Sequence, residues 1–137
     1  EMPLIMRISA REYVEGGYGI DEAIEFSRAY QKAGVDLFHV SAGGEGPIAA
    51  AGKPGTHVAY QVPLARAIKE ELNIPVIAVG RLDEPVLANA VIRNEEADLV
   101  GVGRGMLRNP YWALEAAALL RKETDLPKQY VPGFPRN

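Results

Sequence analysis

Two glycine–arginine pairs are the residues of this sequence best suited to bind a ligand. Gly80-Arg81 and Gly103-Arg104 each follow a short apolar run and precede a helical pattern. Glycine lets a ligand approach the backbone, the free N–H groups at a helix start attract anions, and arginine adds a bidentate donor. This combination suits a phosphate group. The alternative is that each glycine only makes a tight turn and each arginine is solvated.

Arg7 is a second candidate because it interrupts an apolar run, in phase with Ile5 and Ser9. A guanidinium in apolar surroundings needs a partner, since burying an unpaired charge is costly. One interpretation is an ion pair inside the fold. The other is a permanent cation set against an electron-rich ligand.

The remaining polar and aromatic residues do not form a reaction centre. His39 and Ser41 share one face of an apolar run, but no third residue completes a nucleophilic triad. His39 and His57 are the only histidines, and cysteine is absent, so we expect no metal site. Tyr111 and Trp112 are interpreted as core residues. We therefore assign no catalytic residue to this chain.

The elements that must position the arginines alternate between apolar runs and helical stripes. Each run is too short for a helix and apolar on both faces, as expected of strands in a parallel sheet. The four runs are 3–9, 36–41, 75–80 and 98–103. A helical pattern follows each of them, the first from Asp21 to Ala33 with Gly34 as its stop, and the others beginning at Pro63, Pro85 and Pro110. For the last helix we expect Asn109 as N-cap and Trp112, Ala116, Leu119 and Leu120 facing inward.

Four βα units predict an α/β fold in which helices cover a parallel sheet. A complete (βα)8 barrel needs about 250 residues, so four units in 137 residues correspond to half of a TIM barrel, (βα)4. We expect this half-barrel over residues 1–123 and a C-terminal tail over residues 124–137, either a docking arm or disordered. A glycine-rich loop within 42–60 follows the second strand. An open doubly wound sheet is the competing architecture.

Composition and charge exclude several classes of protein. Apolar residues make up 47% and charged residues 24% of the chain, which is typical of soluble globular proteins. A net charge of −3 weighs against non-specific nucleic-acid binding. No apolar run approaches the roughly 18 residues that span a bilayer, and no signal-peptide pattern opens the chain. We expect a cytoplasmic protein with no nucleic-acid or membrane partner, and a chain that is part of a longer one.

Taken together, these segments resemble the C-terminal half of the Old Yellow Enzyme family of FMN-dependent ene-reductases, most closely its bacterial NADPH dehydrogenase branch. The stretches that carry the resemblance follow the order of that family. They are MRISA (6–10), GVDLFHVSAGG (34–44), YQVPLA (60–65), AVG (78–80), DLVGVGR (98–104) and LRNP (107–110).

The resemblance implies strands five to eight of a TIM barrel that binds FMN. It implies that Arg7 lies against the pyrimidine side of the flavin, near N1 and O2, and that Gly80-Arg81 and Gly103-Arg104 hold the FMN phosphate. The implied reaction passes hydride from NADPH through the flavin to an activated alkene. In the family, the substrate-binding residues and the tyrosine proton donor belong to the other half of the barrel, so we expect this chain alone to be inactive.

A half-barrel leaves two open strand edges and an uncovered apolar interior, which favours association. We expect a homo-oligomer or association with the missing half-barrel. The alternative function is a self-associating half-barrel that binds phosphate or FMN without catalysis. A third reading, a flavoenzyme similar to dihydroorotate dehydrogenase, is disfavoured by the combination of Arg7 with 39–41 and 60–63. In the bacterial branch a tail arginine can reach a neighbouring subunit; here Pro132 stands at that position and Arg136 follows it.

Overall fold

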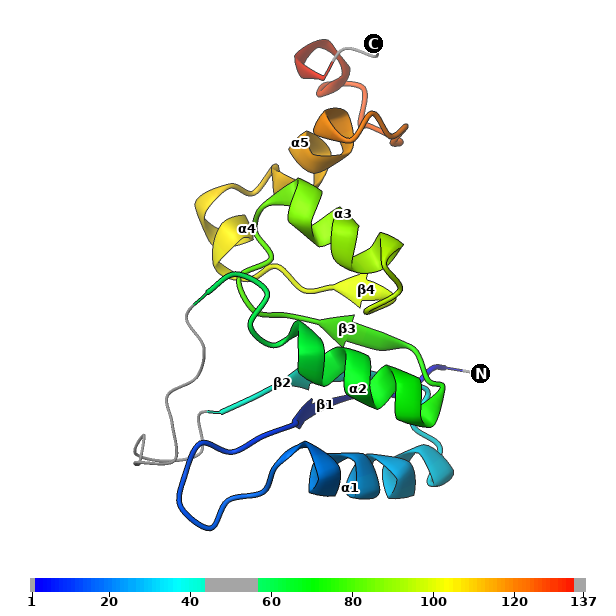
Figure 1. Cartoon of the computed structure of the whole chain (residues 1–137). Coiled ribbons are helices and arrows are strands. Elements are labelled where there is room, and N and C mark those ends of the chain that lie inside the picture. Colours follow the sequence, from blue (N-terminus) through cyan, green and yellow to red (C-terminus); the bar gives the residue numbers. More distant parts are fainter. Residues whose placement is uncertain (1, 44–56, 135–137) are drawn as a thin grey trace.

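Four parallel strands, each followed by helix, make up the fold (Figure 1). The computed structural model describes residues 2–43 and 57–134. The elements are β1 (Ile5–Ser9), α1 (Ile20–Lys32), β2 (Leu37–Ser41), α2 (Val62–Leu72), β3 (Val76–Ala78), α3 (Pro85–Arg93), β4 (Leu99–Val100), α4 (Arg104–Arg108), α5 (Trp112–Leu119) and a 3-10 helix, η1 (Val131–Gly133). The strands pair in the order β1-β2-β3-β4, so the predicted α/β fold with a parallel sheet is confirmed.

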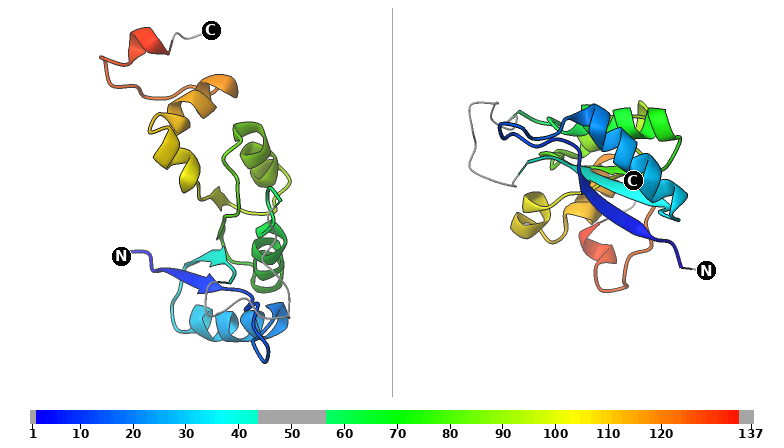
Figure 2. Two further views of the ribbon diagram at one scale, coloured as in Figure 1. Left: turned by 90° about the vertical axis from the view of Figure 1, so that its left-hand side faces the viewer. Right: turned by 90° about the horizontal axis from the view of Figure 1, so that it is seen from below.

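The two faces of the sheet have different surroundings. Figure 2 (left) shows α1, α2 and α3 stacked on one side of the strands. Phe38, Val40 and Val76 are fully buried toward these helices because successive side chains of a strand alternate between faces. On the opposite face, Ile5 and Leu99 are 55% and 52% exposed. Three helices on one face of the sheet match a barrel wall better than a doubly wound sheet, which has helices on both faces.

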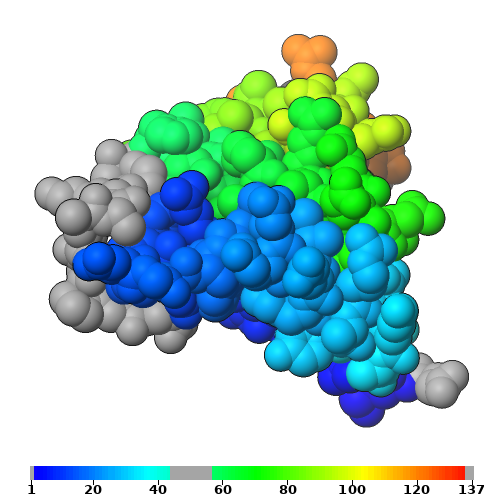
Figure 3. Space-filling view, turned by 60° about the horizontal axis from the view of Figure 1, so that its bottom comes forward, coloured from blue at the N-terminus to red at the C-terminus, as the bar shows by residue number. Residues whose placement is uncertain are grey.

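The helix layer is held together by packing between α1 and α2, which lie side by side as one continuous surface in Figure 3. Ala65 and Ile68 of α2 are fully buried. At the end of this contact, the side-chain amide of Gln31 donates a hydrogen bond to the main-chain oxygen of Leu72 at 3.1 Å. The apolar stripe of α2, which includes Ala65 and Ile68, therefore faces the sheet, as the sequence predicts.

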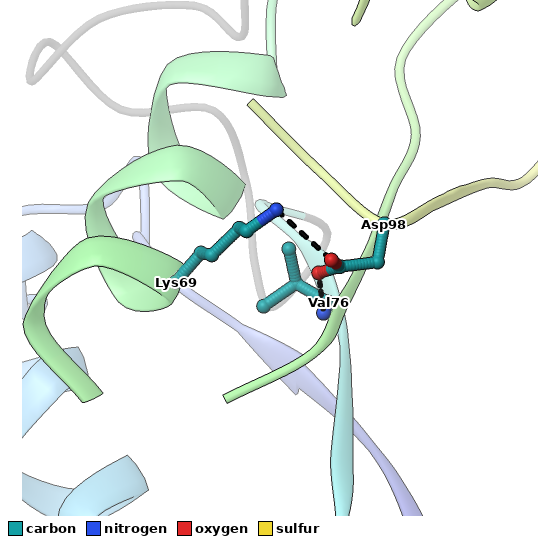
Figure 4. Close-up of polar contacts among 3 residues, drawn as sticks. All are labelled: Lys69, Val76 and Asp98. Atoms are coloured by element: carbon teal, nitrogen blue, oxygen red, sulfur yellow. Dashed lines mark hydrogen bonds and ion pairs between the residues drawn. The ribbon is translucent and has the colours of Figure 1, made fainter. Parts of the chain in front are cut away.

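At the edge of the sheet where the strands begin, Asp98 joins three elements (Figure 4). Its carboxylate accepts hydrogen bonds from the Val76 backbone N–H and from Lys69 Nζ, each at 2.9 Å. Burial raises the pKa of Asp98, but the hydrogen bonds from Lys69 and Val76 and the charge of Lys69 outweigh it, so the pKa lies below its ordinary value. Asp98 thus ties α2 and β3 to the start of β4.

Most predicted helix limits are confirmed within one residue. Helix α1 ends before Gly34, which has the left-handed φ of +106° that favours glycine as a helix stop. Helix α3 begins at Pro85 as predicted, capped by the Glu84 carboxylate, which accepts hydrogen bonds from two backbone N–H groups. The sequence pattern therefore locates the layer of helices that covers the sheet.

The prediction for the last helix is wrong in four respects. A short helix, α4, precedes it, and α5 begins at Trp112 instead of Pro110. Asn109 is extended, as is usual before proline, so it ends α4, while its Oδ1 accepts a hydrogen bond from the Tyr111 N–H at 3.0 Å. Leu119, expected to face inward, is 60% exposed.

The tail folds back on the start of α5. The rings of Tyr111 and Tyr130 pack edge to face, with centroids 5.6 Å apart, and Tyr111 is 45% exposed instead of buried in the core. Arg136 and the glycine-rich stretch of residues 44–56 lie outside the described residues. Within the described part of the chain, no helix is both long and apolar enough to cross a membrane.

Candidate functional site

The segment after β3 makes a sharp turn at Gly80 and Arg81, with φ values of +115° and +59°. The main-chain oxygen of Gly80 accepts a hydrogen bond from the Ala59 N–H at 2.8 Å. A Cβ on Gly80 would lie 3.1 Å from the backbone nitrogen of Gln61. The positive φ therefore favours glycine here, and the close approach of segment 59–61 leaves little room for a Cβ. Arg81 holds a left-handed conformation that costs a non-glycine residue about 1 kcal/mol.

The segment after β4 uses two glycines for different reasons. A Cβ on Gly105 would lie 2.6 Å from the Cβ of Asp83, so a side chain there is excluded by packing. A Cβ on Gly103 would meet no atom of the described residues within 4 Å. Packing therefore explains Gly105 but not Gly103, and the space beside Gly103 is open to a ligand. Arg104 follows, exposed and without an ion pair to any described residue.

Arg7 and His39 are register partners on β1 and β2, so they share the sheet face that the helices leave uncovered. Arg7 is exposed and forms no ion pair with the described residues, which removes the internal ion pair as the explanation for this residue. His39 Nε2 is buried and lacks a hydrogen-bond partner among the described residues. Burial and the nearby Arg7 charge lower the pKa of His39, which keeps the imidazole neutral near pH 7.

A single open cavity of about 1040 Å³ gathers the residues that the sequence predicted. Its volume is at the upper end of the range for small-molecule and cofactor pockets, roughly 300–1,000 Å³. The cavity lies where the strands end, as ligand sites of barrels do. The five predicted cofactor-binding residues all line it: Arg7, Gly80, Arg81, Gly103 and Arg104. Residues that are 97 positions apart in the chain therefore meet at one site.

Tyr60 and Gln61 also line this cavity, although sequence reasoning gave them no role. The Gln61 side-chain amide donates hydrogen bonds to the Tyr60 hydroxyl at 3.0 Å and to the main-chain oxygen of Ala42 at 3.2 Å. These bonds hold the start of α2 against the end of β2. The signal that could have identified them is the stretch 60–65, which contributed to the family resemblance.

Asp83 and Arg108 are a second pair that the sequence did not reveal. The Arg108 guanidinium pairs with the Asp83 carboxylate across the cavity rim. Asp83 is the one carboxylate that the described residues contribute to the cavity wall, against four arginines. The wall is therefore positively charged and suited to an anionic ligand.

FMN, the cofactor implied by the family resemblance, fits this wall in three respects. The arginines provide charge-assisted donors for a phosphate. The open space at Gly103 allows a ligand to approach the backbone. The unpartnered His39 Nε2 and the unpaired Arg7 offer polar contacts to a heteroaromatic ring. Among the described residues, by contrast, no group of three or more His, Asp or Glu side chains could hold a metal ion.

The solved structures that resemble this fold include two TIM-barrel oxidoreductases. Histamine dehydrogenase from Rhizobium sp. 4-9 matches 82% of this chain and 16% of its own, with a TM-score of 0.67 and 24% identity. A 2-naphthoyl-CoA reductase matches 88% of this chain and 18% of its own, with a TM-score of 0.65 and 25% identity. These matches support a segment of a barrel wall.

Comparison of the sequence gives relatives of higher identity. The NADPH dehydrogenase of Halalkalibacterium halodurans is 44% identical over 128 residues, 93% of this chain, and that of Geobacillus thermodenitrificans is 39% identical over 132 residues, 96% of this chain. The chain spans only 37% and 38% of the length of these two relatives. Residues 1–123 match the NADH:flavin oxidoreductase / NADH oxidase family. The expected relationship to bacterial NADPH dehydrogenases is thus confirmed, and the chain belongs to the NADH:flavin oxidoreductase / NADH oxidase family.

Proposed function

We propose that this chain supplies the FMN phosphate site and a flavin-ring arginine to an FMN-dependent oxidoreductase. The observation that carries this proposal is the cavity that brings Arg7 of β1 together with Arg81 and Arg104, which follow β3 and β4. In the proposal, Arg81 and Arg104 bind the phosphate, Gly103 gives it room, and Gly80 makes the turn that brings Arg81 to it. Family membership and the names of the NADPH dehydrogenase relatives support the choice of a flavin and of NADPH.

The position of Arg7 supports a role at the flavin ring. It shares the uncovered sheet face with His39, whose neutral imidazole adds no competing positive charge beside it. In the proposal the Arg7 guanidinium lies at the pyrimidine side of the ring, where a permanent cation favours negative charge on the cofactor.

The chemistry that FMN supplies in this proposal is hydride transfer from NADPH to an activated alkene. The described residues form part of the pocket for this reaction but include no assigned proton donor. We therefore propose that the chain forms strands five to eight of a TIM barrel, that residues 1–123 form this unit and 124–137 its tail, and that it is inactive until it associates with the other half.

A second candidate function is a self-associating half-barrel without catalysis. The observation that favours it is the exposed apolar surface at the two edges of the sheet, where Leu4, Ile5 and Leu99 are 53%, 55% and 52% exposed. Apolar strand edges of this kind favour association between copies. Sedimentation distinguishes the two, because a scaffold forms a stable dimer whether or not FMN is present.

The phosphate contribution is tested by comparing FMN with riboflavin, which has the same ring but no phosphate. We expect the chain to quench flavin fluorescence with a lower Kd for FMN than for riboflavin. Arg104→Ala removes this preference, whereas Arg66→Ala, which breaks an exposed pair with Glu70 on α2, leaves it unchanged. Equal affinity for the two ligands, or an Arg104→Ala chain that keeps the preference, contradicts the proposal.

A further inference from the structure

Asp83 makes three contacts with the segment that follows β4. Its carboxylate pairs with Arg108 at the end of α4. Its main-chain oxygen accepts a hydrogen bond from Trp112 Nε1 at 2.7 Å. Its Cβ lies against Gly105, so close that a Cβ there would stand 2.6 Å away. One residue of the loop after β3 therefore touches α4 and α5 at three points.

These contacts lie where the strands no longer hold the two segments together. The β3–β4 ladder pairs only Ile77 with Leu99 and Ala78 with Val100. Beyond it, one backbone hydrogen bond follows, from the Gly101 N–H to the Ala78 oxygen at 2.8 Å. The two glycine–arginine segments both come after this point. Contacts outside the sheet therefore set the distance between these two segments. Asp83 lies two residues after Arg81, and its partners Gly105 and Arg108 lie one and four residues after Arg104.

The negative charge of Asp83 needs an explanation at a site proposed to bind an anion. A carboxylate at the rim of a cavity that binds an anion repels the ligand and lowers its affinity. Asp83 is nevertheless the one acidic side chain that the described residues place there, among Arg7, Arg81, Arg104 and Arg108. Its side chain is 38% exposed and paired with Arg108. The negative charge of Asp83 is therefore used in an ion pair within the protein.

We propose that Asp83 is the positioning residue of the anion site: it holds the Arg81 segment against the Arg104 segment and keeps Arg108 at the rim. The inference rests on the proposed phosphate site and adds a residue that does not itself touch the ligand. The proposal also predicts the direction in which anion affinity changes when Asp83 is replaced. Simple repulsion predicts that removing the Asp83 charge strengthens anion binding, whereas a positioning role predicts that removing the side chain weakens it.

The experiment measures FMN and inorganic phosphate binding to the chain with Asp83→Ala, Asp83→Asn and the control Glu70→Gln. Glu70 is an exposed carboxylate paired with Arg66, outside the cavity. We expect Asp83→Ala to raise both Kd values by up to about fivefold, the upper end of what the loss of one partly exposed ion pair produces. Asp83→Asn, which keeps an oxygen for Arg108, should lie between Ala and the wild type. Unchanged or tighter binding by Asp83→Ala overturns the proposal.

A measurement that needs no ligand allows the role of Asp83 to be tested separately from the proposed function. Trp112 is the only tryptophan, so its indole N–H gives a single NMR signal that reports on the bond to Asp83. We expect faster hydrogen exchange of this group in Asp83→Ala and in Gly105→Ala than in the wild type. If the wild type binds neither FMN nor phosphate, the proposed function fails, and the indole alone decides on Asp83: faster exchange supports the positioning role, and unchanged exchange overturns it.

Discussion

Asp36 and Asp98 occupy equivalent positions, each one residue before a strand, and make the same pair of contacts with a residue at the start of the preceding strand: Leu4, just before β1, and Val76, the first residue of β3. Asp36 exchanges backbone and side-chain hydrogen bonds with Leu4: Leu4 N–H to Asp36 Oδ2 at 2.8 Å, and Asp36 N–H to the Leu4 oxygen at 3.0 Å. Asp98 does the same with Val76, at 2.9 and 3.0 Å. The strand beginnings of β1–β2 and β3–β4 are thus fixed by one repeated device, which sets the register that carries the cavity residues.

Replacing Asp98 should destabilise the fold more than replacing an ordinary surface carboxylate. Asp98→Ala removes acceptors from the Val76 N–H and from Lys69 at once, and the Val76 N–H then lacks its partner. We expect a loss of about 1–2 kcal/mol in the free energy of unfolding, measured in urea. Glu70→Ala, which breaks only an exposed pair with Arg66, should cost about 0.5 kcal/mol or less. Equal losses would show that the Val76 contact contributes nothing.

The same residue predicts how stability depends on pH. The pKa of Asp98 is lower in the folded chain than its ordinary value of 3.8, so the unfolded chain binds its proton more readily. The contribution of Asp98 is therefore complete above the unfolded pKa and is lost as the pH falls through 3.8 toward the folded value. The difference in unfolding free energy between wild type and Asp98→Asn should be constant near neutral pH and shrink in acid. A difference that grows in acid contradicts this sign.

His39 should titrate below its ordinary pKa of 6.5 because of burial first and the Arg7 charge second. With only two histidines in the chain, NMR titration of the imidazole signals resolves it. Arg7→Met should raise the pKa of His39 part of the way to 6.5, since burial remains. Because the folded chain binds this proton less readily than the unfolded one, acidification below 6.5 lowers stability through His39. No movement of the pKa in Arg7→Met would mean that the two side chains do not interact.

Replacing Gly103 or Gly105, the two glycines after β4, should affect FMN binding and the stability of the fold differently. Gly105→Ala places a Cβ 2.6 Å from Asp83 Cβ and 2.8 Å from Val102 Cγ1, so we expect a loss of about 1–3 kcal/mol in unfolding free energy. Gly103→Ala meets nothing within 4 Å among the described residues and should change stability by less than about 1 kcal/mol. It should instead weaken FMN binding, because its methyl group enters the space proposed for the ligand. Intact FMN binding by Gly103→Ala would place the phosphate elsewhere.

The fold could be predicted because its evidence is local. Each buried strand appears as an apolar run, and each covering helix as a stripe at helical spacing. Helix α4 was missed because it has only five residues, too few to show a period. The sequence places its first residue, Arg104, between an apolar run and a helix that begins at Pro110, whereas the Asn109-Pro110 pair joins two helices.

The site could be predicted only in part, for a related reason. Glycine–arginine pairs at strand ends are visible in the sequence, and so is an arginine within an apolar strand. The contacts that arrange them are not, because Asp83 and Arg108 are 25 positions apart and no periodicity connects them. Likewise, the close approach of Gln61 to Gly80 depends on how one loop packs on the next strand end.

The tail should depend on the contact between Tyr111 and Tyr130. Their rings pack edge to face, and the side-chain hydrogen bond with Tyr130, together with the nearby Tyr130 charge, raises the pKa of Tyr111, so both ring and hydroxyl hold the tail. Tyr130→Ala removes both, and we expect trypsin to cut the tail at Lys128 several-fold faster, because cleavage follows the population of the open form. Tyr130→Phe keeps the ring but loses the hydroxyl, and its cleavage rate should lie between those of the wild type and Tyr130→Ala. If Phe and Ala variants are cleaved equally fast, the hydroxyl and not the ring anchors the tail; if neither differs from the wild type, other contacts hold it.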